Sequence, residues 1–220
     1  MEYLLTHLYP REKGYTTDRQ IAFPVRIFKE DFSLNDNKVC FECRSKDSMF
    51  ADCNQRVLEI SAHKEVHVLN FEQFINQFDG TPAAIIGDRC DYILYDEQKI
   101  AFCDVSCSSR KWVEPNNGKY PQGKRAKVYE QMKNSLNTLL TVTLLDTKIL
   151  SFTFKDAIFG WRERDNYGEE DQAMLNMMLF SKTPSSQEKV LHTEVYAMGH
   201  NFSFVEVEYP QHYIWDENIY

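Results

Sequence analysis

Two aspartates on a predicted β-hairpin are the residues best placed to do chemistry. Asp91 begins an apolar segment over residues 91–95, and Asp104 lies thirteen positions later within a second apolar segment over residues 99–107. The loop at 96–98 closes a hairpin between the two segments. Mg²⁺ is usually bound by one or two carboxylates together with water and phosphate oxygens. The sequence therefore predicts a site for Mg²⁺, or Mn²⁺, at Asp91 and Asp104.

Asp104 is an isolated acid in an apolar strand. The period of two along a strand puts Phe102, Asp104 and Ser106 on one face. A buried carboxylate is costly unless it is paired, protonated or bound to a cation. The alternative is that Asp91 and Asp104 are hydrogen-bonded structural acids, and the residue pattern leaves both readings open.

Local signals predict the elements that would hold the two aspartates. A helix is expected over 70–79, with Asn70 as its N-cap, an apolar stripe at helical spacing and a stop at Asp79-Gly80. The other elements expected around the hairpin are a strand at 83–87, strands at 91–95 and 99–107, a basic helix at 124–141 and a strand at 148–155.

The flanking parts of the chain are expected to complete one α/β domain. The elements predicted there are strands at 19–29 and 38–44, a helix at 48–62, a Met-rich helix over 169–182, and strands at 190–198 and 201–208. We expect an N-terminal β-rich extension (1–69), a core (70–155) and a C-terminal helix and β-hairpin (156–220) that completes the same domain.

The order helix, three-stranded meander, helix, strand resembles the PD-(D/E)XK nuclease core, also called the restriction-endonuclease-like fold. In that family an acid begins the second core strand, and a (D/E)-x-K motif lies on the third. Asp91 matches the first acid, and Asp104-Val105-Ser106 matches the motif at its acid alone. The resemblance covers residues 70–155. It implies an α/β fold with a restriction-endonuclease-like core and added N- and C-terminal strands, and a Mg²⁺-dependent hydrolase acting on nucleic acid phosphodiesters.

Ser106 stands where the family carries a lysine that activates the attacking water and balances phosphoryl charge. The lysine can migrate to another element in this superfamily. Lys124 and Lys127 are the best candidates, because they share one helix face with Gln131, which would orient the site. Glu72 on the first helix matches an optional carboxylate of the family and would be a further metal ligand.

The resemblance thus implies catalytic roles for Asp91, Asp104, Lys124, Lys127 and Gln131, and metal ligation by Asp91, Asp104 and Glu72. The missing motif lysine also allows a different function. On that second hypothesis the chain is a catalytically inactive nuclease-fold protein that serves as a protein- or nucleic-acid-binding module.

Charge gives mixed indications about partners. A net charge of −8 and a pI near 5.3 disfavour a dedicated nucleic-acid binder. The segment from Arg110 to Lys133, however, contains seven basic residues against two acidic ones. That segment is either a solvated loop and helix face or a surface that contacts the phosphate backbone. A protein partner or a homo-oligomer is also compatible with the sequence.

The six cysteines are expected to be reduced thiols in a cytoplasmic protein, since the chain shows neither a signal peptide nor an apolar run that could span a membrane. Cys40 and Cys43, with His63 and His67, form an alternative zinc pattern. The gap between the two pairs exceeds the usual finger spacing. Thiols three residues apart on a strand also point to opposite faces, which disfavours zinc.

Overall fold

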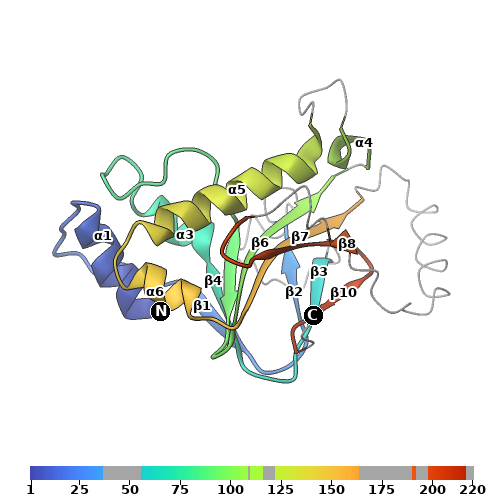
Figure 1. Cartoon of the computed structure of the whole chain (residues 1–220), viewed down its shortest axis with the longest axis horizontal. Coiled ribbons are helices and arrows are strands. Elements are labelled where there is room, and N and C mark those ends of the chain that lie inside the picture. The colour runs from blue at the N-terminus through green and yellow to red at the C-terminus, as the bar shows by residue number, and fades with distance from the viewer. Residues whose placement is uncertain (37–55, 109, 116–121, 164–189, 192–197, 217–220) are drawn as a thin grey trace.

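The computed structural model describes residues 1–36, 56–108, 110–115, 122–163, 190–191 and 198–216. These residues form a mixed α/β structure around a seven-stranded sheet (Figure 1). Helices cover one face of this sheet, and a smaller three-stranded sheet packs on the other. Each face of the large sheet therefore has its own apolar core.

The large sheet combines an antiparallel and a parallel part. Its strands, in spatial order, are β1 (Val25–Phe28), β4 (Val66–Asn70), β5 (Tyr92–Tyr95), β6 (Lys99–Cys107), β7 (Phe154–Arg162), β9 (Ser203–Glu208) and β8 (Val190–Leu191). The pairs β6–β7 and β7–β9 are parallel, and the other neighbouring pairs are antiparallel. The parallel β6–β7 pair requires a crossover, which α5 provides.

The described helices are η1 (Leu4–Leu8), α1 (Tyr9–Glu12), α3 (Phe71–Asn76), α4 (Arg110–Val113), α5 (Gly123–Leu140) and α6 (Leu145–Leu150). The small sheet has the order β10 (His212–Ile214), β3 (Arg56–Ser61), β2 (Phe32–Asn35). Successive side chains of β6 point to opposite faces of the large sheet, so the strand contributes to both cores. Phe102 packs toward the helices and Cys103 toward the small sheet.

Three elements predicted around the aspartates are confirmed. The side chain of Asn70 accepts a hydrogen bond from the Gln73 amide and caps α3. Strands β5 and β6 form the predicted antiparallel hairpin. Helix α5 covers nearly the whole range predicted for the basic helix.

The strand predicted at 83–87 is wrong, since this segment has no strand structure. The side chain of Asn134 donates to the carbonyls of Ile86 and Asp88, at 3.2 and 3.0 Å. Gly87 has a φ of +95°, which a strand does not allow. Strand β4 takes the place next to β5, so the three-stranded meander β4–β5–β6 has α3 inserted after its first strand.

Two further predictions of secondary structure are corrected. Residues 148–150 belong to α6, because Leu145 and Ile149 pack into the core four residues apart, and the following strand is β7. Within the predicted helix at 48–62, the described part is strand β3, in which the buried Leu58 packs against Gly160 of the large sheet. Residues 48–55 lie outside the described residues.

The secondary structure predicted for the N- and C-terminal parts of the chain is confirmed in part. Of the strand predicted at 19–29, only β1 forms, directly after Pro24. The second strand of the C-terminal pair is β9, and of the first only β8 and Met198 are described. The strand predicted at 38–44 and the Met-rich helix lie outside the described residues.

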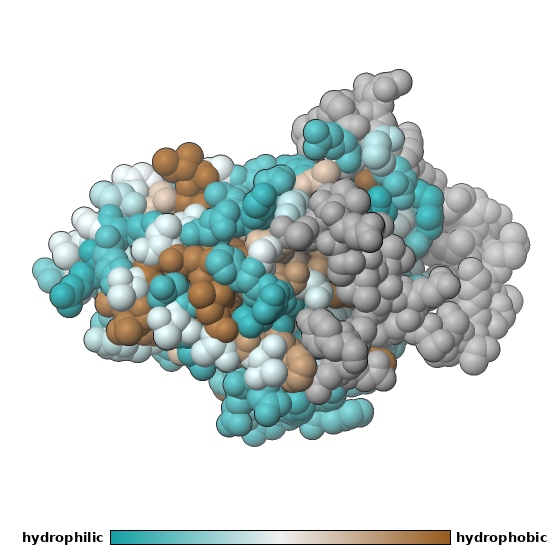
Figure 2. All heavy atoms as spheres, viewed as in Figure 1, coloured by the Kyte–Doolittle hydropathy of each residue, from teal (hydrophilic) through white to brown (hydrophobic). Residues whose placement is uncertain are grey.

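Large apolar side chains remain exposed at scattered positions of the surface. Those described as exposed are Tyr3, Ile27, Ile86, Trp112, Leu144 and Leu150. On the face shown in Figure 2, apolar groups occur as separate patches among hydrophilic ones. Within the described residues, no helix is long and apolar enough to cross a membrane.

Gly160 allows the two sheets to approach closely. A Cβ atom at this position would lie 2.7 Å from the Cβ of Leu58 on β3. We expect Gly160→Ala to lower the free energy of unfolding by about 1–3 kcal/mol, because the added methyl group overpacks the interface. Urea denaturation measures this change. Adding Leu58→Ala should recover part of the loss, and strictly additive effects of the two substitutions would contradict the steric explanation.

Candidate metal and lysine site

Asp91 is fixed through both its backbone and its side chain. Its carbonyl accepts hydrogen bonds from the amides of Phe71 and Glu72, at 2.9 and 3.2 Å, at the start of α3. Its Oδ2 accepts a hydrogen bond from the Val105 amide of β6 at 3.0 Å. The bond to Val105 therefore fixes the Asp91 carboxylate at the edge of β6.

The hairpin register brings Asp91 and Asp104 toward each other. Tyr92 pairs with Cys103 and Ile93 with Phe102, so one more step in the same register sets Asp91 opposite Asp104. Ile93 and Phe102 both pack on the helix-covered face, and alternation puts the two aspartates on that face as well. Directly opposed residues of an antiparallel pair have Cβ atoms about 4.5–5.5 Å apart. Both side chains are buried, at 6% and 5% exposed.

The thiols around the aspartates indicate the same proximity. Burial is the main cause that raises the pKa of Cys103, and the negative charges of Asp104 and Asp91 raise it further. The pKa of Cys90 is likewise raised, first by burial, and the same two carboxylates contribute. Asp91 and Asp104 therefore lie near the same two buried thiols.

Lys124 reaches the strand position at which the motif lysine is missing. Its Nζ donates hydrogen bonds to the Oγ of Ser106 and, at 3.0 Å, to the Oγ of Ser108. Ser106 is fully buried and lies on the same face of β6 as Asp104. Lys124, at the start of α5, thus carries its amine to the residue two positions beyond Asp104.

Lys127 and Gln131 contact a different part of the chain. Lys127 Nζ forms an ion pair with Asp88 Oδ2 at 3.2 Å. Gln131 Nε2 donates to the carbonyl of Arg89 at 3.1 Å. Both residues hold the segment that leads into Asp91, so the structure assigns them contacts outside the immediate surroundings of Ser106.

Asp36 is a buried acid near the site that the sequence did not indicate. It directly follows β2, and its Oδ2 accepts a hydrogen bond from the Cys107 amide at 3.0 Å. Asp91 uses the amide of Val105 in the same way. Amides two residues apart point to the same edge of a strand. Two carboxylates thus bind the edge of β6 beyond the end of β5.

Glu72 lies in the first turn of α3, next to the backbone of Asp91. In the described part of the chain, no group of three or more His, Cys, Asp or Glu side chains is arranged to hold a metal ion. The pair Asp91 and Asp104 is smaller than such a group, and Mg²⁺ accepts two carboxylates with water and phosphate oxygens.

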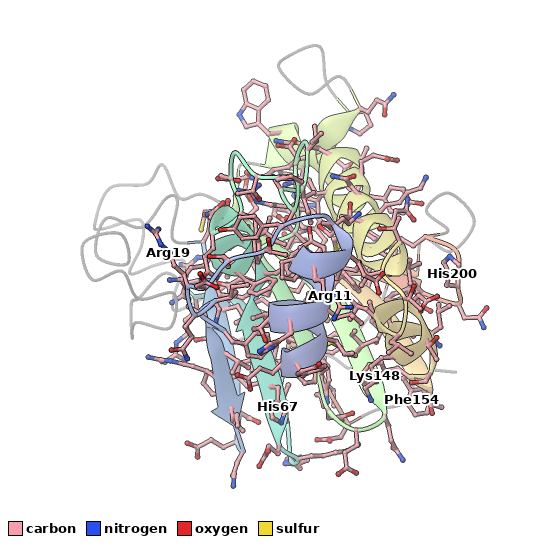
Figure 3. The ribbon with its side chains drawn as sticks, turned by 90° about the vertical axis from the view of Figure 1, so that its left-hand side faces the viewer. Arg11, Arg19, His67, Lys148, Phe154 and His200 are labelled. Atoms are coloured by element: carbon pink, nitrogen blue, oxygen red, sulfur yellow. The ribbon has the colours of Figure 1, made fainter. Side chains whose placement is uncertain are left out.

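The zinc pattern lies partly outside the described residues, because Cys40 and Cys43 are not described. His67 stacks on Tyr95 with ring centroids 5.0 Å apart and pairs with Glu65. In Figure 3, His67 and Phe154 lie at the lower end of the large sheet. Because β6 starts beside Phe154, Asp104 and Ser106 lie toward the other end.

Much of the positive charge in the basic segment is paired within the protein. Arg110 pairs with Glu208, Arg125 with Glu114 and Glu206. Lys133 Nζ lies 5.7 Å from the centre of the Tyr129 ring. The charges of Arg110 and Arg125 are therefore offset by these glutamates, whereas the Tyr129 ring carries no net charge.

Comparisons of the chain with protein-family models, with curated proteins and with solved structures found no match. The function is therefore inferred below from the residues of this chain.

Buried thiols and Tyr92 should make stability fall at alkaline pH. Cys90, Cys103 and Tyr92 all have pKa values raised well above their usual ones, mainly by burial. In the unfolded chain these groups lose protons near pH ~8.5 for Cys and ~10 for Tyr. The unfolded state therefore ionises first, above about pH 8.5 for the two thiols and above about pH 10 for Tyr92, and each group then removes about 1.4 kcal/mol per further pH unit.

We expect the midpoint of guanidinium unfolding to fall between about pH 8 and about pH 10.5, and Tyr92→Phe to reduce that fall. A midpoint that does not change over this range would contradict the assignment of these groups as protonated in the folded state. Cys90, Cys103 and Cys107 are free thiols. The other three cysteines, at 40, 43 and 53, lie outside the described residues.

Proposed function

We propose that the chain is a metal-dependent nuclease with a restriction-endonuclease-like core, in which the motif lysine has migrated from β6 to the start of α5. The observation that carries this proposal is the bond from Lys124 Nζ to Ser106 Oγ, on the strand face that Asp104 shares. Asp91, opposite Asp104 in the hairpin register, supplies the second carboxylate.

The two carboxylates fit a hydrated Mg²⁺ or Mn²⁺. Two buried acids of like charge on neighbouring strands raise the free energy of the folded state, and a bound cation offsets this cost. Asp91 and Asp104 would hold the ion, which would polarise a phosphoryl oxygen and favour formation of hydroxide from bound water. The hydrogen bond from Val105 to Asp91 fixes one ligand in place before binding.

Lys124 would stabilise the negative charge that develops on the phosphoryl group during hydrolysis. A positioned cation is effective at such a site when its orientation is set in advance. Ser106 and Ser108 accept hydrogen bonds from the amine and hold it on the strand face that Asp104 shares. Lys127 and Gln131 contribute indirectly, because they bind the backbone and side chain of residues 88–89 just before Asp91.

A catalytically inactive binding module is the second candidate. One observation favours it: Asp91 and Lys124 both bond to partners within the protein, as structural residues would. On this reading the same residues stabilise the end of β6, and the basic segment contacts nucleic acid or a protein partner without cleavage.

A cleavage assay separates the two candidates. Purified protein is incubated with single- and double-stranded DNA and RNA in Mg²⁺, in Mn²⁺ and in EDTA. The nuclease proposal predicts cleavage of at least one substrate that requires the cation. Binding of a substrate with no cleavage in either metal would favour the inactive module. A matched preparation of the Asp104→Asn variant controls for contaminating nucleases.

A further inference from the structure

The first turn of α5 is anchored to the sheet by two consecutive side chains that diverge. Lys124 reaches Ser106 on β6, whereas Arg125 reaches Glu206 on β9. Strand β7 lies between these two strands. The sheet register sets Ser106 beside Trp161 of β7, and sets Phe159 of β7 between Asp104 and Glu206. The helix start therefore spans β7.

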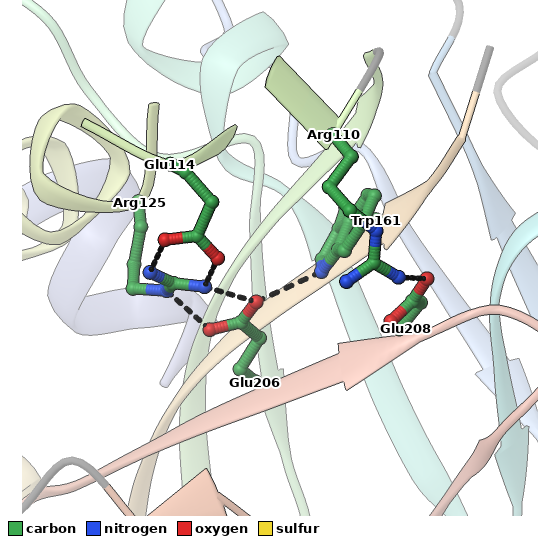
Figure 4. A network of polar contacts seen from close by, with 6 residues as sticks. All are labelled: Arg110, Glu114, Arg125, Trp161, Glu206 and Glu208. Carbon is green, nitrogen blue, oxygen red and sulfur yellow. Dashed lines mark hydrogen bonds and ion pairs between the residues drawn. The ribbon is translucent and has the colours of Figure 1, made fainter. Parts of the chain in front are cut away.

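Through its guanidinium group, Arg125 joins α5 to β9 and to Glu114, the residue that follows α4 (Figure 4). Its Nη2 donates to Glu206 Oε1 at 3.0 Å, and its Nε pairs with the other oxygen of Glu206. On its other side, Nη1 and Nη2 bind the two oxygens of Glu114 at 3.1 and 3.0 Å. Two bidentate contacts fix both the position and the orientation of this planar group.

Glu206 is itself held from the sheet side. The indole Nε1 of Trp161 donates to Glu206 Oε1 at 2.9 Å. Trp161 is 2% exposed and the Glu206 side chain 9%, so this contact is shielded from water. Salt screens a buried pair less than a surface pair. The Arg125–Glu206 pair therefore provides a firm link between α5 and the sheet.

Gly123 allows the close approach on which this geometry depends. Its φ is +80°, and a Cβ atom there would lie 2.4 Å from the carbonyl oxygen of Val113. The start of α5 consequently packs directly on the end of α4, beside Glu114. Lys124 lies between this tight contact and the Arg125 pair, so its backbone is restrained on both sides.

From these contacts we propose that Arg125 and Glu206 form a clamp that positions the Lys124 amine at Ser106. This inference rests on the proposed function for the role of Lys124, but the positioning itself can be measured without substrate. Arg125 and Glu206 are positioning residues, since they act through Lys124. Arginine is suited to the task because a lysine cannot form two bidentate contacts at once.

The test measures how fast an amine reagent modifies Lys124 in the metal-free full-length protein. Peptide mass spectrometry after limited reductive methylation gives the modification of Lys124 relative to that of Lys127, one turn along the same helix. We expect Arg125→Gln and Glu206→Gln each to raise this ratio at least about fivefold, because the amine leaves its serine partners more often. General loosening of the helix would raise both rates and leave the ratio unchanged.

Glu208→Gln is the matched control. It makes the same carboxylate-to-amide change two residues further along β9 and removes the pair with Arg110, without touching α5. The modification of Lys124 relative to Lys127 in Glu208→Gln should equal that in the wild type. The clamp is ruled out if Glu206→Gln, shown to be folded by circular dichroism, leaves the ratio at the wild-type value, or if Glu208→Gln raises it equally. Glu206→Gln carries the test if Arg125→Gln does not fold.

The outcomes for the clamp and for the nuclease are independent. If the wild type cleaves nucleic acid, Arg125→Gln should lower kcat with little change in KM, since substrate binding does not require the clamp. If neither the wild type nor any variant cleaves nucleic acid, the proposed function fails. The modification ratio of Lys124 to Lys127 still decides whether the clamp positions Lys124.

Discussion

Asp104→Asn is expected to reduce metal-dependent cleavage at least about 1000-fold, which corresponds to about 4 kcal/mol of transition-state stabilisation. Asparagine keeps the shape of the side chain but removes the charge that would hold the cation. Asp104 is 5% exposed, so water and dissolved anions have little access to take the place of the missing carboxylate. Initial rates on the best substrate in saturating Mn²⁺ measure the effect.

The variant should remain folded, since replacing a buried charge by a neutral group of similar size removes a desolvation cost. Asp18→Asn is the matched control, because Asp18 is an exposed acid in the segment before β1, outside the candidate site. Retained cleavage in a folded Asp104→Asn protein would remove the proposed site.

Lys124→Ala is expected to lower kcat by about 100- to 1000-fold, because it removes the positive charge held at Ser106, two positions beyond Asp104. Lys127→Ala should cost less than about tenfold, since Lys127 pairs with Asp88 and acts on the segment before Asp91. Single-turnover rates for the two variants measure the difference. Equal losses for both would contradict the assignment of Lys124 as the migrated lysine.

A swap of the lysine provides a stricter test of the same position. Ser106 is fully buried, so a lysine there needs the space that the Lys124 side chain now fills. The double variant Ser106→Lys with Lys124→Ala should recover activity lost in Lys124→Ala alone, because the amine returns to the strand face that it occupied. If the double variant is no more active in cleavage than Lys124→Ala, the position of the amine does not determine activity.

The elements near the aspartates could be predicted because their signals are local. Asn70 caps α3 through a bond to a residue three positions away, and a three-residue loop closes the β5–β6 hairpin. The site prediction depended on the hairpin alone. The register that sets Asp91 opposite Asp104 was not predicted, because it depends on the pairing of Tyr95 with Ile100 that the structure shows.

Other features depend on contacts between distant parts of the chain. Residues 83–87 have strand-like composition, but Asn134 of α5 binds the carbonyls of Ile86 and Asp88 and prevents a ladder. Asp36 reaches the site through the Cys107 amide, seventy-one positions away, and no local pattern marks it. The residue types in VHVL at 66–69 could have indicated β4.

The choice between Lys124 and Lys127 also required the structure. Residues at i and i+3 share a helix face, so periodicity gives both lysines the same direction. How far each one reaches depends on where α5 begins, and that is set by the contact of Gly123 with Val113. Such a contact joins two segments across a loop and leaves no periodic signal in the sequence.

Location of a bound Mn²⁺ ion tests the central claim most directly. Crystals soaked in Mn²⁺ and measured near the manganese absorption edge give its position from anomalous scattering. We predict one ion within about 2.5 Å of an oxygen of Asp91 and of Asp104, and its loss in Asp104→Asn. Crystals with no manganese between these two carboxylates, or with manganese bound elsewhere alone, would contradict the metal site on which the proposed nuclease depends.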